Sequence, residues 1–436
     1  MPTSSQSRQD AQRISFRFDF VIRVILYILI FWIPYSPAVI ESCVVVALLI
    51  WLIKRTVLRV FRNRYDPLTF RGFFLGFAPP PNILNQSIGI FIGACLLSVI
   101  SSTFWQQAFQ GFITKTLEWF VIYFLIIETF QKKRHIIIAI SLFMFSSFAV
   151  CLDGVLQFYL LHKDIFLGRP LIEGGATASF KHYNNLGAYL TFVVLNASAL
   201  LFFNGRILYR MLFGGYFLLA GWAVVLTFSR GAWVGVISGI IFLVLFLKKK
   251  LIVGIIFILC IFLMCFYLFF PIEQAKKFRM DVMNIKETVY QRAELWREGL
   301  VMVKDKPFFG HGLNTFMNLF QAYRLNPDFP PTYAHNCYLQ MTAEIGLVGL
   351  ASFLYLLWNF FYGVISNLAL YGPKRDFLQL GILGFLGGTF AFLVHCFFET
   401  SLYSLQLVGL LWVMVAFIIS IDKILISEIN RDIRRA

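Results

Sequence analysis

The sequence predicts an all-α polytopic membrane protein, and its composition, its apolar spans and its distribution of positive charge support this fold class. Of the 436 residues, 59% are hydrophobic and 14% are charged, whereas soluble proteins carry about 25% charged residues. Apolar stretches long enough to cross ~30 Å of hydrocarbon recur along the whole chain. We therefore expect one membrane domain over residues 1–436. The polar first residues contain no apolar stretch followed by a cleavage site, so we expect no removable signal peptide.

Twelve stretches are candidate membrane-spanning helices. They are 17–35, 37–53, 86–104, 111–130, 135–160, 186–204, 208–228, 232–247, 251–271, 336–363, 377–398 and 402–424. With the N-terminus in the cytoplasm, Lys and Arg gather in the loops that face inward, as at 54–71, 132–134 and 248–250. The short outward loops near 36 and at 399–401 carry none. This pattern follows the positive-inside rule, and it predicts about twelve spans with both termini in the cytoplasm.

Two longer segments face outward in this topology, a smaller loop at 161–185 and a large loop at 272–335. The large loop contains the stretch IKETVYQRAELWREGLVMVKD, followed by Pro307, Gly310 and Gly312. Its apolar residues at helical spacing are Val289, Ala293, Trp296, Leu300 and Val303. We expect an amphipathic helix at the outer membrane–water interface, ended by the proline and glycines.

The formal net charge of +16 indicates orientation first, and attraction to anionic lipid headgroups or a phosphate-bearing substrate second. We expect membrane lipids and no nucleic acid among the partners. The sequence has no GxxxxGK[ST] for nucleotide phosphates and no HExxH or CxxC spacing for a metal. We therefore expect no cofactor.

Arg230 stands in TFSRGAW (227–233) between two apolar runs, on the outer side of the predicted topology. A cation at a place that the topology disfavours is a functional candidate. The guanidinium stays charged and binds phosphate through two parallel N–H groups. The alternatives are a side chain that snorkels to the interface and a structural ion pair with a carboxylate such as Asp153 or Glu344.

His335 stands at the mouth of a span and is followed by Asn336. A histidine titrates near neutral pH and can act as general base on a hydroxyl, although a lone interfacial histidine is more often a satisfied surface residue. Glu344 lies within the span, about 13 Å deeper. A carboxylate in a membrane needs a partner, functional or structural.

Further polar candidates lie in the two outward loops. The segment EGGATASFKHYNNLG (173–187) offers Lys181, His182, Asn184 and Asn185 as hydrogen-bond donors. Its glycines permit a close approach of the backbone to a ligand. Arg292 and Arg297 lie five residues apart on the predicted loop helix and share a face poorly, so a solvated charge is the alternative for each.

These segments together resemble the O-antigen ligase and polymerase family of bacterial envelope enzymes. The matching stretches are GATASFKHYNNLGAYL (175–190), TFSRGAWVG (227–235), RAELWREGLVMVKDKPFFGHGLNTF (292–316) and HNCYLQMTAEIGLVGL (335–350). The resemblance covers about 165–350 in the order of the family's motifs. It implies transfer of a glycan from undecaprenyl diphosphate at the periplasmic face of the inner membrane. For a ligase, the acceptor would be a sugar hydroxyl of lipid A–core, and neither metal nor nucleotide would be needed.

The resemblance also implies roles for individual residues. Arg230 and Arg292 would bind the diphosphate, and His335 would activate or position the acceptor hydroxyl. Many family members carry a further basic residue just before the Asn-rich segment; here that register holds GGATA, so Arg169 or Lys181 would substitute. The remaining substrate-binding candidates are His182, Asn185, Arg297, Asn336 and Glu344. In-line attack on the donor would invert the anomeric carbon.

Several alternatives stay open from the sequence alone. The short tail after the last span lacks the extra domain of the family's protein-directed enzymes, which favours a ligase or a polymerase. The length and the single large loop favour the ligase. An anion transporter would line a path with ionisable residues, whereas the midspan charges are few. A non-catalytic scaffold would leave Arg230, Arg292 and His335 on one side unexplained. The oligomeric state is not predicted.

Overall fold

The protein is helical throughout the part of the chain that the structure describes. The computed structural model describes residues 4–63, 79–172, 174–246, 285–324, 332–371 and 376–435. Within these ranges, β-structure is limited to isolated bridges in the smaller loop. Every predicted span except 251–271 coincides with a helix, and 251–271 lies outside the described residues. So do the basic residues at 248–250 and the first part of the predicted large loop.

The helices follow one another with short connections in the described ranges. The first half contains α1 (Ser4–Trp32), α2 (Pro37–Asn63), α4 (Asn85–Ser101), α5 (Trp105–Phe112), α6 (Glu118–Thr129) and α7 (Lys133–Leu156), with π-helical turns at Ile113–Leu117 and Gln157–Leu161. The second half contains α8 (Tyr183–Leu200), α9 (Ile207–Leu226), α10 (Arg230–Phe246), α13 (Ile285–Asp305), α14 (Phe316–Tyr323), α15 (Cys337–Leu368), α16 (Phe377–His395) and α17 (Leu405–Ile433).

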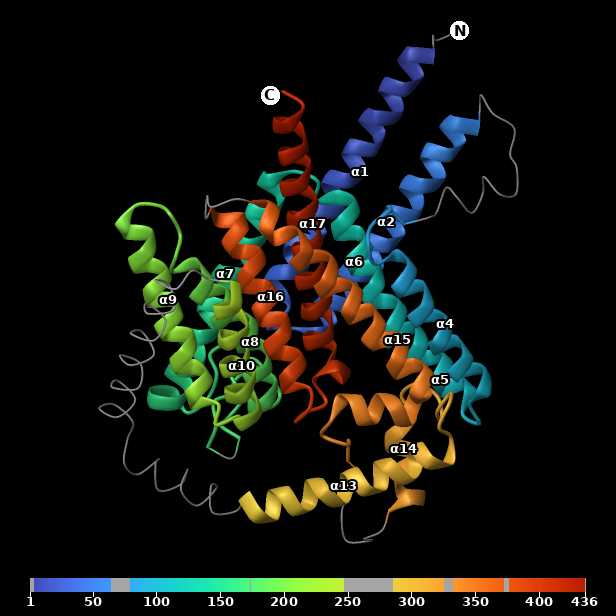
Figure 1. The fold of residues 1–436 in the computed structure, drawn as a ribbon, viewed down its shortest axis with the longest axis vertical. Coiled ribbons are helices and arrows are strands. Elements are labelled where there is room, and N and C mark those ends of the chain that lie inside the picture. Colours follow the sequence, from blue (N-terminus) through green and yellow to red (C-terminus); the bar gives the residue numbers. More distant parts are fainter. Residues whose placement is uncertain are drawn as a thin grey trace.

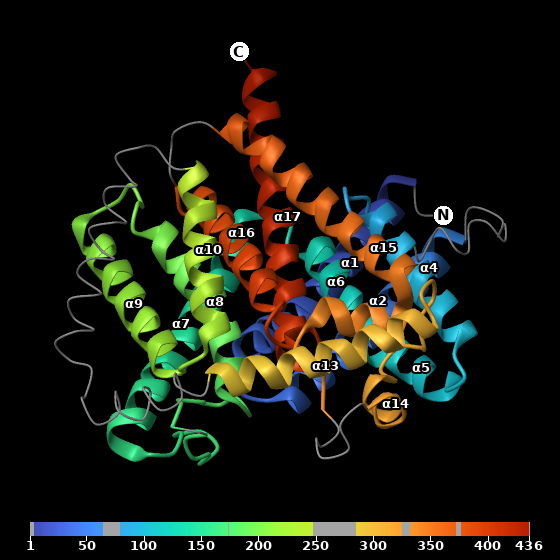
Figure 2. The same cartoon turned by 60° about the horizontal axis from the view of Figure 1, so that its bottom comes forward.

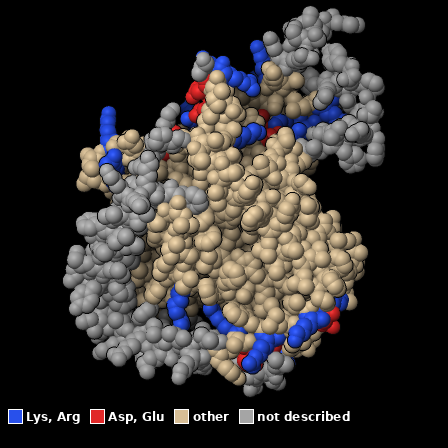
Figure 3. Space-filling model, in the orientation of Figure 1, with Lys and Arg blue, Asp and Glu red and all other residues tan. Residues whose placement is uncertain are grey.

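The length and composition of these helices define a multi-pass membrane protein. Seven helical segments are long and apolar enough to cross a membrane, and two shorter apolar helices, Asn85–Ser101 and Arg230–Leu245, accompany them. Figure 3 shows a broad belt without charge between two zones where charged side chains gather. This confirms a polytopic helical membrane protein, while the count of twelve spans stays a prediction.

The helix bundle has two distinct ends. Both termini lie at one end, and α13 lies across the opposite end (Figure 1). Figure 2 brings that second end forward and shows α13 crossing it; we call it the α13 end. α17 forms the centre of the bundle, because 89% of its apolar window is buried within the protein. Charged groups at the α13 end are therefore separated from both termini by the apolar belt.

Small residues bring α8, α10 and α16 into close contact. An added Cβ at Gly384 of α16 would lie 2.7 Å from Asn196 Cα of α8. An added Cβ at Gly235 of α10 would lie 2.7 Å from Ala391 O of α16. Small residues at such interfaces let helices in membranes pack backbone to backbone. These helices thus form a rigid support for the groups at their ends.

α13 has the bounds that the sequence predicts, but it buries a different face. It ends at Asp305, before Pro307, as expected. Leu295 and Met302 are buried against α14 and α15, whereas Leu300 of the predicted apolar stripe is 50% exposed. The predicted stripe was wrong as the buried face, because α14 and α15 cover the helix along a neighbouring line of side chains.

A break in α15 anchors the loop that follows α13. Gly346 has φ 71° and ψ −179° within the helix, which leaves backbone groups without helical partners. The loop 307–312 supplies the missing partners through the hydrogen bonds Leu347 N–Pro307 O, Val348 N–Phe308 O, His311 N–Ala343 O and Gly312 N–Glu344 O. Backbone groups within a membrane protein must be satisfied internally, so the loop and the break depend on each other.

We expect Gly346→Ala to destabilise the protein. The positive φ alone costs an L-residue roughly 1–2 kcal/mol, and the new Cβ would lie 2.1 Å from Phe308 O. Gly89→Ala in α4 is the control, because a Cβ there meets nothing within 4 Å. Thermal unfolding of the detergent-solubilised protein should show a lower midpoint for Gly346→Ala and none for Gly89→Ala. Equal midpoints would contradict the dependence of the loop on the break.

Candidate active site

The carboxylate of Glu399 joins three segments that lie far apart in the sequence. Its Oε1 accepts hydrogen bonds from Asn184 Nδ2 at 2.5 Å and from Arg292 Nη2 at 3.0 Å. Its Oε2 lies 3.0 Å from His335 Nδ1. The first turn of α8, the helix α13 and the residues before α15 therefore meet at the turn between α16 and α17. We call Asn184, Arg292, His335 and Glu399 the Glu399 cluster.

Glu399 is mostly buried and is ionised at neutral pH. Its side chain is 12% exposed. Burial raises the pKa of this carboxyl, but the hydrogen bond and charge of His335 and the positive charges of Arg292 and His395 outweigh burial, so the pKa lies below its usual value. A negative charge thus stands between two of the predicted catalytic residues.

Sequence reasoning missed Glu399, because the loop 399–401 drew attention only for its lack of Lys and Arg. A usable signal was present, since a lone carboxylate at the outer end of a span faced several outward cations without an assigned partner. Asn185 was proposed as a substrate-binding residue in that comparison, whereas its neighbour Asn184 is the residue that reaches Glu399.

The local backbone fixes the position of His335. The residue has φ 46°, a left-handed conformation between the end of the loop and the start of α15. On one side, Ala334 O accepts from Trp296 Nε1 of α13. On the other, Asn336 caps α15 through its side-chain oxygen, and Cys337 N donates to Cys396 O at 2.8 Å. The imidazole is 36% exposed, so it is held in place and still reachable from solvent.

Arg230 is the first residue of α10 and is exposed. Its neighbour Gly231 lies against the turn that carries Glu399, since an added Cβ at Gly231 would be 3.1 Å from Phe398 Cβ. Arg230 is therefore at the α13 end, beside the Glu399 cluster. It makes no ion pair with any residue that the structure describes.

The two structural pairs considered for Arg230 are absent, because the carboxylates have other donors. Asp153 accepts from Ile165 N at 2.8 Å. Glu344 accepts from Asn314 N at 2.9 Å, Phe316 N at 3.3 Å and Gln340 Nε2 at 3.3 Å. The expectation that Glu344 pairs with an arginine was wrong. Its carboxylate instead fixes the backbone at the start of α14.

The other candidates differ in what their side chains already hold. Arg169 donates from Nη1 to Ser179 O at 2.5 Å, within the smaller loop. His182 caps α8, with Nδ1 accepting from Asn184 N. Arg297 pairs with Glu294 at 2.7 Å on the exposed side of α13. Lys181 is exposed. The cluster therefore contains Arg292 and His335 but not Arg169, His182 or Arg297.

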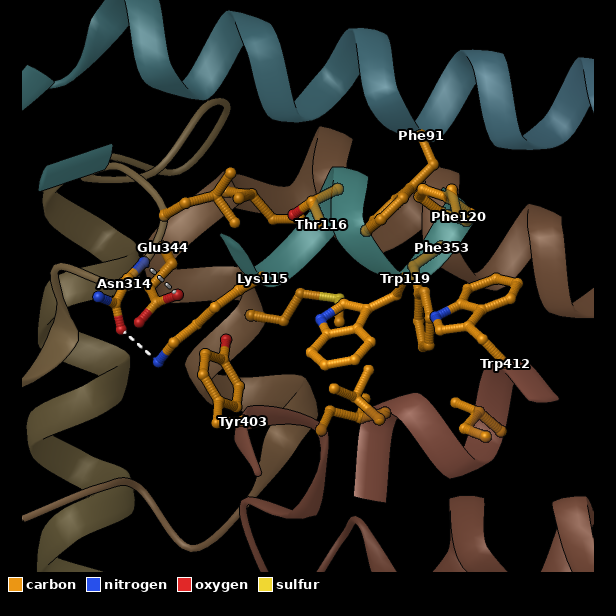
Figure 4. Close-up of a pocket in the computed structure, with 16 residues that line it drawn as sticks. Phe91, Lys115, Thr116, Trp119, Phe120, Asn314, Glu344, Phe353, Tyr403 and Trp412 are labelled. Carbon is orange, nitrogen blue, oxygen red and sulfur yellow. Dashed lines mark hydrogen bonds between the residues drawn. The ribbon is translucent and has the colours of Figure 1, made fainter. Parts of the chain in front are cut away.

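A small cavity adjoins the cluster on the side of α6 and α17. Its volume is about 70 Å³. Lys115, Asn314, Glu344 and Tyr403 form its polar end, and aromatic side chains such as Trp119 and Trp412 form its walls (Figure 4). Lys115, which sequence reasoning did not single out, lies in the π-helical turn Ile113–Leu117 and donates to Asn314 Oδ1 at 2.7 Å.

The groups at the α13 end can bind an anion and accept a proton. Arg230 and Arg292 present guanidinium N–H donors, which suit phosphate oxygens. His335 Nε2 makes no hydrogen bond with the described part of the chain, so it can accept the proton of a hydroxyl. Over the same described ranges, no three His, Cys, Asp or Glu side chains group so as to hold a metal ion.

The fold and the site together define a multi-pass helical membrane protein with a cationic, histidine-containing site at one end. Residues 215–354 match the family model described as O-antigen ligase. That segment holds Arg230, Arg292 and His335, and it belongs to the O-antigen ligase family. The match confirms the resemblance seen in the sequence and indicates a membrane enzyme of the ligase or polymerase type.

A relative supports the match over part of the chain. An uncharacterised protein of Haemophilus influenzae (strain ATCC 51907 / DSM 11121 / KW20 / Rd) is 26% identical over 188 residues, which cover 39% of this chain and 47% of that protein. The chain thus matches about half the length of this relative.

Proposed function

We propose that the protein is an O-antigen ligase-type glycosyltransferase. It transfers a glycan from undecaprenyl diphosphate to a sugar hydroxyl of lipid A–core at the periplasmic face of the bacterial inner membrane. The observation that carries this proposal is the meeting of Arg292 and His335 on Glu399, next to the exposed Arg230. A diphosphate leaving group needs cations, and an attacking hydroxyl needs a base, within the same small volume.

The reaction divides between these residues. Arg230 and Arg292 bind the donor diphosphate and neutralise the charge that grows on the leaving oxygen. His335 Nε2 takes the proton of the acceptor hydroxyl while its oxygen attacks the anomeric carbon. The bond from that carbon to the diphosphate oxygen breaks, and the electron pair stays on the diphosphate. In-line attack inverts the anomeric carbon, and the energy stored in the donor makes nucleotide and metal unnecessary.

The remaining candidates would serve as secondary contacts. Lys181 is the better choice for a third phosphate-binding cation, because Arg169 already donates to Ser179 O. His182, Asn185, Arg297, Asn336 and Glu344 would shape the substrate site from its margins. The orientation is proposed from the predicted topology, with both termini in the cytoplasm and the α13 end in the periplasm. The separation of the two ends in Figure 1 supports it.

The acceptor decides between a ligase and a polymerase of this family. Purified protein would be supplied with an undecaprenyl-diphosphate-linked glycan and lipid A–core, and the products separated by size and by lipid. We expect the glycan on lipid A–core. Elongation of the lipid-linked glycan without use of lipid A–core would establish a polymerase instead. An intact donor under every acceptor condition would overturn the transferase proposal and favour the anion transporter.

Arg230→Ala is expected to lower transfer about 100-fold or more, the cost typical of removing one charge-stabilising donor from a transition state. Arg230→Lys should lose less, because it keeps the charge and loses only the planar fork. Arg210→Ala is the control, since Arg210 lies near the start of α9 and bonds Phe203 O. Initial rates at saturating donor measure the effect. Wild-type rates for Arg230→Ala would make Arg230 a membrane anchor.

A further inference from the structure

We propose that Glu399 is the positioning residue of this site. It holds His335 in the tautomer whose Nε2 can take a proton, and it places Arg292 beside that histidine. Nothing in the sequence motifs points to Glu399, and the inference rests on the proposed function.

The first step of the argument is the tautomer of His335. An ionised carboxylate can only accept hydrogen bonds. Glu399 Oε2 lies 3.0 Å from His335 Nδ1, so the proton of the neutral imidazole must be on Nδ1. The lone pair is then on Nε2, the nitrogen without a partner in the described ranges. Carboxylates fix the tautomer of catalytic histidines in this way in other enzymes.

The second step is the rigidity of Glu399 itself. Asn184 and Arg292 both donate to Oε1, so the carboxylate is held from two directions besides His335. Its backbone is held as well, because Cys337 Sγ donates to Glu399 O at 3.0 Å and accepts from Leu402 N. A group whose contacts are satisfied on every side can hold its neighbours at fixed positions.

The third step is charge. When His335 takes a proton, the imidazolium Nδ1–H faces a carboxylate that is already ionised, which stabilises the new positive charge. Arg292 has one N–H on Glu399 and is 29% exposed. Its other N–H groups remain for the diphosphate of the donor. One carboxylate therefore aligns the base with the cation that receives the leaving group.

The kinetic test is Glu399→Gln, which keeps the shape and removes the charge. We expect kcat to fall by about 10²–10⁴-fold, the range that a correctly placed base contributes, while KM for the donor changes less than about threefold. Asp305→Asn is the matched control, an exposed carboxylate on the same side that bonds Tyr323. In a His335→Ala background, Glu399→Gln should cause little further loss, because Glu399 acts through His335.

A purely structural role predicts another outcome. Glu399→Gln would then lower the thermal midpoint, and its loss would multiply with that of His335→Ala. Either result would overturn the proposal. Glu399→Asp, which keeps the charge but shortens the side chain, should recover part of kcat if positioning is the role.

The tautomer can be measured without transferase activity. Nitrogen-15 NMR of histidine-labelled protein in detergent, with His335→Ala to assign the signal, reports which ring nitrogen carries the proton. We expect Nδ1–H in the wild type and a loss of this preference in Glu399→Gln. If the wild type shows Nδ1–H but no turnover of donor, the proposed function fails while the positioning by Glu399 stands. An Nε2–H signal in the wild type overturns the positioning itself.

Discussion

His335→Ala should lower glycan transfer by about 10²–10⁴-fold, the contribution of a well-placed general base. The imidazole is held by Glu399 at Nδ1 and leaves Nε2 free at a partly exposed position. Removing the ring leaves the acceptor hydroxyl without a group to take its proton. The measurement is the initial rate of transfer at saturating donor and acceptor, with protein amount and thermal midpoint matched to the wild type.

The control for this substitution is His162→Asn. His162 is an exposed histidine of the smaller loop with φ 56°, and asparagine tolerates that left-handed conformation. We expect wild-type rates for this variant. If His335→Ala kept more than about a tenth of the wild-type rate, His335 would not be the base, because even the lower end of the general-base range is larger.

Arg292→Ala is the second substitution with a large expected effect, about 10²–10³-fold on kcat. It removes a guanidinium that serves the diphosphate and also the partner of Glu399 Oε1. Arg292→Lys keeps a positive charge but loses the planar fork that binds phosphate through two N–H groups, so we expect an intermediate rate. Rates should be measured over a range of donor concentrations, to separate binding of the donor from stabilisation of the leaving group.

Lys304→Ala is the matched control for Arg292→Ala, because it removes a cation from the last turn of the same helix. We expect its rates to equal those of the wild type. Equal losses for Arg292→Ala and Lys304→Ala would mean that general positive charge on α13, and not the contact with Glu399, supports the reaction.

The helices were predictable because their signals are local. Apolar spans and the periodicity of 285–305 depend on neighbouring residues, and α13 has the bounds that the sequence predicts. The face that α13 buries was not predictable, since an amphipathic pattern does not say which element covers it. The break at Gly346 was also hidden, because it exists only together with the distant loop 307–312.

The candidate site was predictable only in part. Arg230 and His335 stood out because the topology places them at the outer ends of spans. Glu399 did not, since its meaning comes from partners 64, 107 and 215 residues away. The pairs suggested for Arg230 failed for a related reason, because Asp153 and Glu344 bond backbone amides that no sequence pattern identifies.

The most direct test of the central claim is the turnover of an undecaprenyl-diphosphate-linked glycan by purified protein, with lipid A–core, EDTA and no nucleotide. The account predicts that the wild type and His162→Asn release undecaprenyl diphosphate and glycosylate lipid A–core, whereas His335→Ala and Arg292→Ala do so at least about 100-fold more slowly. Turnover that is equal in all four proteins, or that requires a divalent metal or a nucleotide, would contradict a transfer site built on Glu399.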